Sequence, residues 1–316
     1  AGGSSKRNAR QAVARLRALL KQPGSGSALR QCAPGPSLDP GAHSLSALAA
    51  GSSVAVGPAF KAGVGKADIT GPCAETTFLG YGNFQEKGKG ILTRLYSRAF
   101  IFEDPQGQRA AFVAVDINQM SDLIRLEVLD RLKASFGDLY HMANTMLTAS
   151  HTHTAPGGFS GYLLYDTTSL GFDQVNFDAI VAGIVRSVAL AHASMAPQDV
   201  SLGTATVAGA QKNRSPQAYD ANPPGERAQY HEKFDAVMTG LRIGDNGLLN
   251  WLPVHPTSMG NTSTLVSSDN KGFAAHAVEA HRSPGFVAAF AQSNEGDVSP
   301  NLWGPPDGTH DLLRMR

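Results

Sequence analysis

The stretch that decides how this chain folds is residues 143–159, which read ANTMLTASHTHTAPGGF. Apolar residues among threonines predict a short strand that ends in His151-Thr152-His153, before Pro156-Gly157-Gly158 turns the backbone away. Side chains alternate along a strand, so the two imidazoles share one face if the strand continues that far. They would then form half of a metal site, because catalytic zinc takes about three protein ligands and one open position. Two polar residues at a strand end, with no metal, explain so short a motif equally well.

Strand and helix patterns alternate on both sides of this stretch. Two apolar runs at 94–103 and 109–115 flank the turn sequence Asp104-Pro105-Gln106-Gly107 and predict paired strands. Apolar residues recur at helical spacing in 121–136 and 173–194. The alternation predicts an α/β fold, with mixed layered sheets flanked by helices, in a compact domain that begins near Phe60. Its other expected elements are a helix at about 270–281 and strands at 199–208, 234–243, 248–255 and 286–292.

The composition is that of an ordinary globular protein. Of its 316 residues, 42% are hydrophobic and 17% are charged, and the net charge is +1. Proteins that bind nucleic acid usually carry a concentrated basic surface, so we expect no nucleic-acid partner. No run approaches about 18 consecutive apolar residues, and we therefore expect no membrane span within this sequence.

The first 58 residues differ in composition from the rest. Residues 1–22 predict an amphipathic helix, whose basic face either is solvated or touches an anionic membrane surface. Residues 23–58 are rich in Gly, Ser, Pro and Ala and predict a linker or an irregular arm. We therefore divide the chain into a basic helix and arm, 1–58, and a compact domain, 59–316. Cys32 and Cys73 either form a disulfide or remain free thiols.

Three further segments contain residues that could take part in chemistry. His255 follows an apolar strand, where α/β proteins gather site residues, although a histidine there is commonly only hydrogen-bonded. Ser299 lies in a polar loop after the strand at 286–292 and could be a nucleophile if a base or metal activates it, or simply a turn residue. Arg214 could hold an oxyanion, or it could be an ordinary surface arginine.

Seven motifs, taken together and in order, closely resemble the neutral ceramidase family, also described as neutral/alkaline non-lysosomal ceramidases. The likeness covers roughly residues 60–310. The motifs are GYG (80–82), GILTRLYSRAF (90–100), SHTHTAPGGF (150–159), NRSP (213–216), HPTSM (255–259), SDNKG (268–272) and GDVSPN (296–301).

The resemblance implies a role for each candidate residue. It makes Ser299 the catalytic serine, and it makes His151 and His255 ligands of a catalytic Zn²⁺. His153 would lie beside the scissile bond, and Arg214 would contact the reacting group. The implied reaction is zinc-dependent hydrolysis of the N-acyl amide of ceramide to sphingosine and fatty acid.

The resemblance also indicates what this sequence lacks. In the family, a glutamate and a tyrosine complete the zinc site far downstream of the serine, and an immunoglobulin-like domain follows. The chain stops at Arg316, so we expect a ceramidase-like catalytic domain, 59–316, truncated at its C-terminus. A further C-terminal segment or a partner chain would then complete the zinc site.

The resemblance also implies where the protein acts and on what kind of substrate. The substrate would be ceramide or another sphingolipid at a membrane surface, and the protein would be extracellular or secreted, either free or associated with a membrane. Two other functions stay open: hydrolysis of a different N-acyl lipid, and a truncated lipid-binding or interaction module without catalysis.

Overall fold

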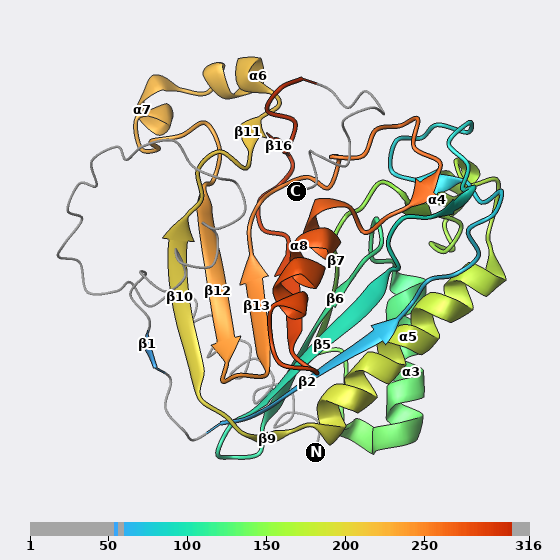
Figure 1. Cartoon of the computed structure of the whole chain (residues 1–316), viewed down its shortest axis with the longest axis vertical. Helices are drawn as coiled ribbons and strands as arrows, with labels where there is room; N and C mark the ends of the chain where they lie inside the picture. Colours follow the sequence, from blue (N-terminus) through green and yellow to red (C-terminus); the bar gives the residue numbers. More distant parts are fainter. Residues whose placement is uncertain (1–53, 56–59, 305–316) are drawn as a thin grey trace.

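The computed structural model describes residues 54–55 and 60–304 (Figure 1). The predicted helix at 1–22, nearly all of the predicted arm, and Cys32 lie outside the described residues. Cys73 is half-buried and forms no disulfide with any described residue. The described chain is built on two large sheets, and this confirms the predicted α/β fold with mixed layered sheets and flanking helices.

The first sheet has the strand order β7-β6-β5-β2-β9. Its strands are β2 (Lys61–Asp68), β5 (Tyr96–Glu103), β6 (Arg109–Val115), β7 (Thr145–Ala149) and β9 (Ala196–Pro197). β2, β5 and β6 are antiparallel neighbours, as the turn sequence between β5 and β6 predicts. β7 runs parallel to β6, because helix α3 (Asp122–Phe136) makes the crossover between them.

Strand β2 was not among the expected elements, since two glycines interrupt its apolar pattern. Those glycines allow helix α5 (Gln174–Ala193) to lie directly on the strand. A Cβ on Gly63 would stand 2.0 Å from Ala191 O, and one on Gly65 would stand 2.2 Å from Ser187 O. Close packing of helix and strand therefore explains why the sequence signal of this strand is weak.

The second sheet has the strand order β1-β10-β12-β13-β15. Its strands are β1 (Val54–Ala55), β10 (Val200–Thr206), β12 (Val237–Ile243), β13 (Gly247–Trp251) and β15 (Val287–Ala291). The last two strands are parallel, with helix α8 (Asp269–Ala280) as their crossover. β1 belongs to the segment predicted as an arm, and it forms the edge of this sheet by pairing with β10.

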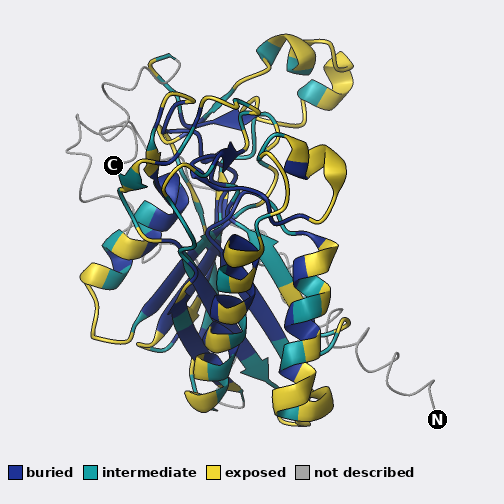
Figure 2. Ribbon diagram, turned by 90° about the vertical axis from the view of Figure 1, so that its right-hand side faces the viewer, coloured by how far each residue is buried: buried dark blue, intermediate teal, exposed yellow. Residues whose placement is uncertain are grey.

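The hydrophobic core has two main layers. One lies between the two sheets, where Phe100 and Phe112 of the first sheet meet Leu241 and Leu249 of the second. The other lies between the first sheet and helices α3 and α5, whose outer sides are exposed (Figure 2). α5 is long and apolar enough to cross a membrane by length and composition, but half of it is buried in this core, so it is weak evidence for a span.

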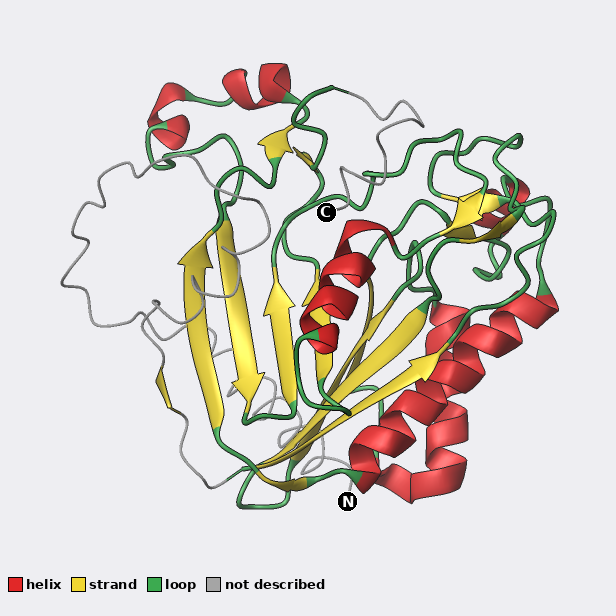
Figure 3. Cartoon of the chain, viewed as in Figure 1, coloured by secondary structure: helices red, strands yellow, loops and turns green. Residues whose placement is uncertain are grey.

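Loops and short elements cover one end of the molecule, at the top of Figure 3. They connect the carboxyl ends of β7, β13 and β15 to the rest of the chain. The short elements at this end are β3 (Phe78–Leu79), β8 (Ala155–Pro156), β4 (Gly90–Ile91), β14 (Leu265–Val266), β11 (Lys212–Asn213), β16 (Val298–Ser299), α4 (Leu163–Thr167), α6 (Pro216–Asp220) and α7 (Pro224–Arg227). The short helix η1 (Gly137–Leu139) lies at the opposite end, where it continues α3 before the amino end of β7.

Candidate metal centre

Three imidazoles converge beyond the carboxyl ends of β7 and β13. Strand β7 ends at Ala149, so the predicted strand does not continue to His151 and His153. Instead the backbone turns at His151, whose φ of 75° lies in the left-handed region. One ligand nitrogen from each of His151, His153 and His255 lies within 4.8 Å of the others. The structure thus brings both predicted zinc ligands together and adds His153 to the group.

Backbone carbonyls fix the orientation of two of these rings. His151 Nδ1 lies 2.7 Å from Asn118 O, and His255 Nδ1 lies 3.2 Å from Glu295 O. A carbonyl oxygen can only accept, so each Nδ1 carries the hydrogen and each Nε2 keeps its lone pair. Histidines that bind a metal commonly have this arrangement, in which the second ring nitrogen donates a hydrogen bond to a supporting group.

His153 is the third member of the cluster, and its ring packs closely against the GYG motif. Its Nε2 is 3.3 Å from His151 Nε2, and the ring of Tyr81 packs edge-on at 4.7 Å. A Cβ on Gly80 would stand 2.6 Å from His153 Cγ, so glycine is required at that position. Among the described residues, none hydrogen-bonds the buried His153 Nδ1.

All three imidazoles are held in the neutral form. Burial lowers the pKa of His153 to about 3, and the neighbouring histidines and Arg214 act in the same direction. Burial also lowers the pKa of His255, to about 4, and that of His151. Neutral imidazole is the metal-binding form, so at neutral pH no proton competes for these nitrogens.

The start of α8 holds the segment that contains His255. The buried carboxylate of Asp269 accepts hydrogen bonds from Ser258 N and Met259 N at 3.2 and 3.0 Å. Asn270 Nδ2 donates to His255 O at 3.0 Å. Lys271, also buried, donates from Nζ to Leu252 O, just after β13. The SDNKG motif therefore builds the support of His255, a role that the sequence did not reveal.

One carboxamide ties the two histidine segments to each other. Gln292 Nε2 donates to Ser150 O and to Val254 O, each at 2.8 Å. Those two carbonyls precede His151 and His255 in the chain. A residue just after β15 therefore sets the separation of segments more than a hundred positions apart in sequence.

The predicted catalytic serine lies on the segment next to His255. Ser299 is buried in β16, and the preceding carbonyl, Val298 O, accepts from His255 N at 3.3 Å. Ser299 Oγ accepts a hydrogen bond from Asn301 N at 3.1 Å, and Asn301 Nδ2 donates to Thr257 O at 3.0 Å. Hydrogen bonds thus fasten the GDVSPN motif to the HPTSM motif.

Arg214 and Glu295 place opposite charges at this centre. Arg214 is exposed and donates from Nε to Gly296 O at 3.0 Å, and its charge lowers the pKa of all three histidines. Glu295 Oε2 lies 3.9 Å from His255 Nδ1. Burial raises the pKa of Glu295 to about 7, against the opposing effects of Lys271 and Arg214. In the sequence, Glu295 is indistinguishable from a turn residue.

The donor set fits a zinc ion. His151 and His255 direct Nε2 lone pairs from rings whose Nδ1 atoms are already hydrogen-bonded, and a nitrogen of His153 lies within 4.8 Å of a nitrogen of each. Zinc binds neutral imidazole readily and is satisfied by about three protein ligands at a catalytic site. The fold and this centre together define an α/β protein with a cluster of three histidines, able to hold a metal ion, at the carboxyl ends of its strands.

Comparisons with known proteins identify the family. The profile described as "Neutral/alkaline non-lysosomal ceramidase, N-terminal" matches residues 60–311, and the chain belongs to this family. Neutral ceramidase of Drosophila pseudoobscura pseudoobscura is 45% identical over 258 residues, which are 78% of this chain and 37% of the relative. Neutral ceramidase of Mycobacterium tuberculosis is 44% identical over 273 residues, 80% of this chain and 43% of the relative.

A solved structure has the same fold. It is titled "Ceramidase complexed with C2" and superposes with a TM-score of 0.76 at 40% identity, over 81% of this chain and 42% of the other. The chain thus spans about two fifths of the length of these relatives.

Proposed function

We propose that this chain carries the N-terminal part of a zinc-dependent amidohydrolase that cleaves the N-acyl amide of ceramide to sphingosine and fatty acid. The observation that supports this most directly is the convergence of three neutral imidazoles beside the Ser299 segment. Membership of the neutral ceramidase family supports the reaction and the substrate class.

We assign to each candidate residue the role that the family resemblance implies. His151 and His255 would hold zinc through Nε2, with the two further ligands that the resemblance implies coming from outside this sequence. Bound zinc would act as a Lewis acid toward the amide carbonyl and would favour ionisation of a hydroxyl or water. Ser299 would attack the carbonyl or position the attacking water. His153, neutral at pH 7, would accept the proton and return it to the leaving amine. Arg214 would hold the oxyanion, a role worth about 3 kcal/mol.

The test compares ceramide turnover before and after Ser299→Ala in the protein loaded with zinc. We expect a loss of at least about 100-fold, because removal of a nucleophile or its oxyanion partner typically costs that much or more. Ser293→Ala, at an exposed serine six positions upstream, is the matched control and should retain activity. Unchanged turnover by Ser299→Ala would contradict the proposed role. Faster turnover of a water-soluble N-acyl amide than of ceramide would favour the alternative substrate.

We also propose that the substrate is met at a lipid surface, outside the cytoplasm, and that the segment around α4 makes the contact. Leu163 and Leu164 are 86% and 78% exposed, and Leu170 and Phe172 are exposed nearby. The sequence from 159 to 175 contains no lysine or arginine. Its two carboxylates, Asp166 and Asp173, accept hydrogen bonds from nearby residues of the same segment. An exposed apolar segment without basic residues suits a neutral lipid surface better than an anionic one.

A further inference from the structure

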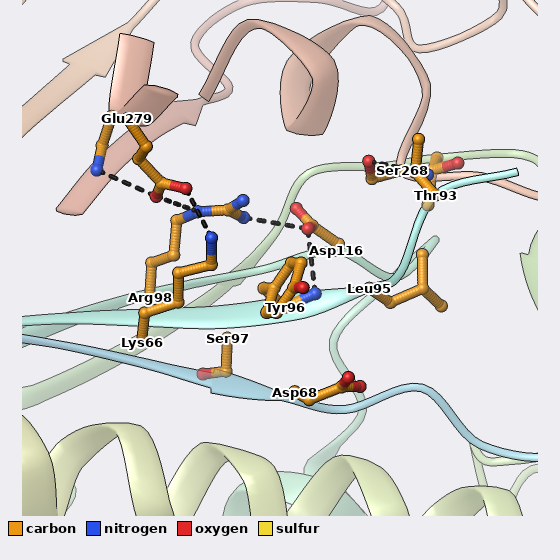
Figure 4. Close-up of polar contacts among 12 residues, drawn as sticks. Lys66, Asp68, Thr93, Leu95, Tyr96, Ser97, Arg98, Asp116, Ser268 and Glu279 are labelled. Atoms are coloured by element: carbon orange, nitrogen blue, oxygen red, sulfur yellow. Dashed lines mark hydrogen bonds and ion pairs between the residues drawn. The ribbon is translucent and has the colours of Figure 1, made fainter. Parts of the chain in front are cut away.

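A cluster of four charged side chains, three of them buried, joins the first sheet to helix α8 (Figure 4). Arg98, on β5, is at its centre. Its Nη1 donates to Asp116 Oδ2 at 2.9 Å, and its Nε donates to Glu279 Oε1 at 3.1 Å. Lys66 Nζ forms an ion pair with Glu279 Oε2. The charges balance, and the side chains of Arg98, Asp116 and Glu279 are 3, 5 and 8% exposed.

Asp116, one partner of Arg98, is connected through the backbone to the residues that hold His151. Asp116 directly follows β6 and also accepts a hydrogen bond from Tyr96 N at 3.0 Å, so its position is fixed from two sides. Two residues further on is Asn118, whose carbonyl oxygen orients His151. Ile117, between them, accepts a hydrogen bond from His151 N at 3.0 Å. The backbone that carries Asp116 is therefore the backbone that places His151.

Glu279, the other partner of Arg98, is connected through helix α8 to the residues that hold His255. Glu279 lies in the last turn of α8 and also accepts from Ala288 N of β15 at 3.2 Å. The first turn of the same helix contains Asp269 and Asn270, which hold the segment around His255. A helix of 12 residues is effectively rigid over this length, so the position of its C-terminal end determines that of its N-terminal end.

We infer that Arg98 is a positioning residue that, together with Gln292, sets the separation of His151 and His255. A guanidinium suits this role because its planar fork presents donors in two fixed directions, toward Asp116 and toward Glu279. An ammonium group has no such fork and cannot hold two carboxylates at set angles. The inference concerns residues of this chain only and does not depend on which amide the protein cleaves.

The test measures the imidazoles directly, without metal and without substrate. Long-range ¹⁵N spectra of the histidine rings report the tautomer of each ring, and wild-type His151 and His255 should both be Nδ1–H. Arg98→Met should mix the tautomers at both rings, and Arg98→Lys should give a smaller change. In a parallel titration, Arg98→Met should lower Co²⁺ affinity by about 10- to 100-fold, as loss of support behind metal ligands commonly does.

Two milder substitutions separate the two paths and remain informative if Arg98→Met does not fold. Asp116→Asn should disturb the His151 signals more than those of His255, and Glu279→Gln should do the reverse. The matched control is Arg109→Met, which removes an arginine of the neighbouring strand β6 that pairs with Glu103 at 2.6 Å. Arg109→Met should change the stability of the protein but leave the ring tautomers of His151 and His255 unchanged.

Three results would overturn the inference. They are unchanged ring spectra in folded Arg98→Met, equal effects of Asp116→Asn and Glu279→Gln on both rings, or the same spectral change in Arg109→Met. If wild type binds no Co²⁺ while the ring spectra respond as expected, the proposed metal chemistry fails and the positioning role stands.

Discussion

At the scale of single residues, Glu86 is buried in a way that should limit stability. It is 1% exposed, and neither carboxylate oxygen has a hydrogen-bond partner among the described residues. Burial raises the pKa of this carboxyl from 4.5 to about 8. Between those values the folded protein retains a proton that the unfolded chain has released, so Glu86 lowers stability as the pH rises through this window.

Glu86→Gln should therefore stabilise the protein, and more so at high pH. A pKa difference changes stability by about 1.4 kcal/mol per pH unit within its window, so we expect a gain at least about 2 kcal/mol larger at pH 8 than at pH 5. Urea denaturation at the two pH values measures it. Glu232→Gln, at an exposed glutamate, should show no such difference. An equal gain for Glu86→Gln at both pH values would contradict the expectation.

The candidate site residues predicted from sequence are those whose side-chain groups are themselves reactive or able to bind a metal. His151, His153, His255 and Ser299 stand out because imidazole and hydroxyl groups follow strands in recognisable motifs. The supporting residues could not be found in this way. Asn118 acts through its backbone carbonyl, and Gln292 acts by binding two carbonyls, so their importance depends on where the fold places those carbonyls.

At the scale of elements, α4 and the residues just after it should determine attachment to lipid. Leu163→Asp combined with Leu164→Asp should reduce binding to vesicles of neutral phosphatidylcholine by at least about 10-fold, because two apolar side chains worth more than about 1 kcal/mol each would be lost. Vesicle sedimentation measures the bound fraction. Met142→Asp is the control, since Met142 is 48% exposed before the amino end of β7, away from the histidines. Equal loss in both variants would argue against a specific role for α4.

The elements themselves were predictable where the pattern was strong. Strands β5 and β6 and helices α3 and α5 appear where apolar spacing and turn residues predicted them. β2 was not predicted, because Gly63 and Gly65 serve contact with α5 rather than strand formation. β7 is shorter than the motif suggested, because His151 adopts a positive φ that ends the strand.

At the scale of the whole molecule, the core between the sheets should make the two sheets unfold together. Phe100→Ala should cost about 3–5 kcal/mol, since Phe100 is fully buried between them. Trp251 fluorescence reports on the second sheet, and far-UV circular dichroism reports largely on the helices that cover the first. The two urea transitions should coincide in wild type and shift together in the variant. Phe84→Ala, at a residue 46% exposed, should change stability by no more than about 0.5 kcal/mol. Two separate transitions would contradict a shared core.

Strand order is the part of the architecture that the sequence could not supply. β2 pairs with β5 and with the distant β9, and β13 pairs with both β12 and β15. These neighbours are chosen by packing between segments far apart in the chain. Local periodicity contains no information about that choice.

At His151, the position of an imidazole in the histidine cluster coincides with a positive φ, which strains the backbone. A backbone angle of this kind costs about 1 kcal/mol or more for most residues; histidine, asparagine and aspartate adopt it more readily than other residues with a side chain, and glycine adopts it most readily. A lineage released from the need for this imidazole would therefore relax its backbone by replacing it. Glycine in its place would relieve the backbone but would remove both the imidazole and its hydrogen bond to Asn118 O.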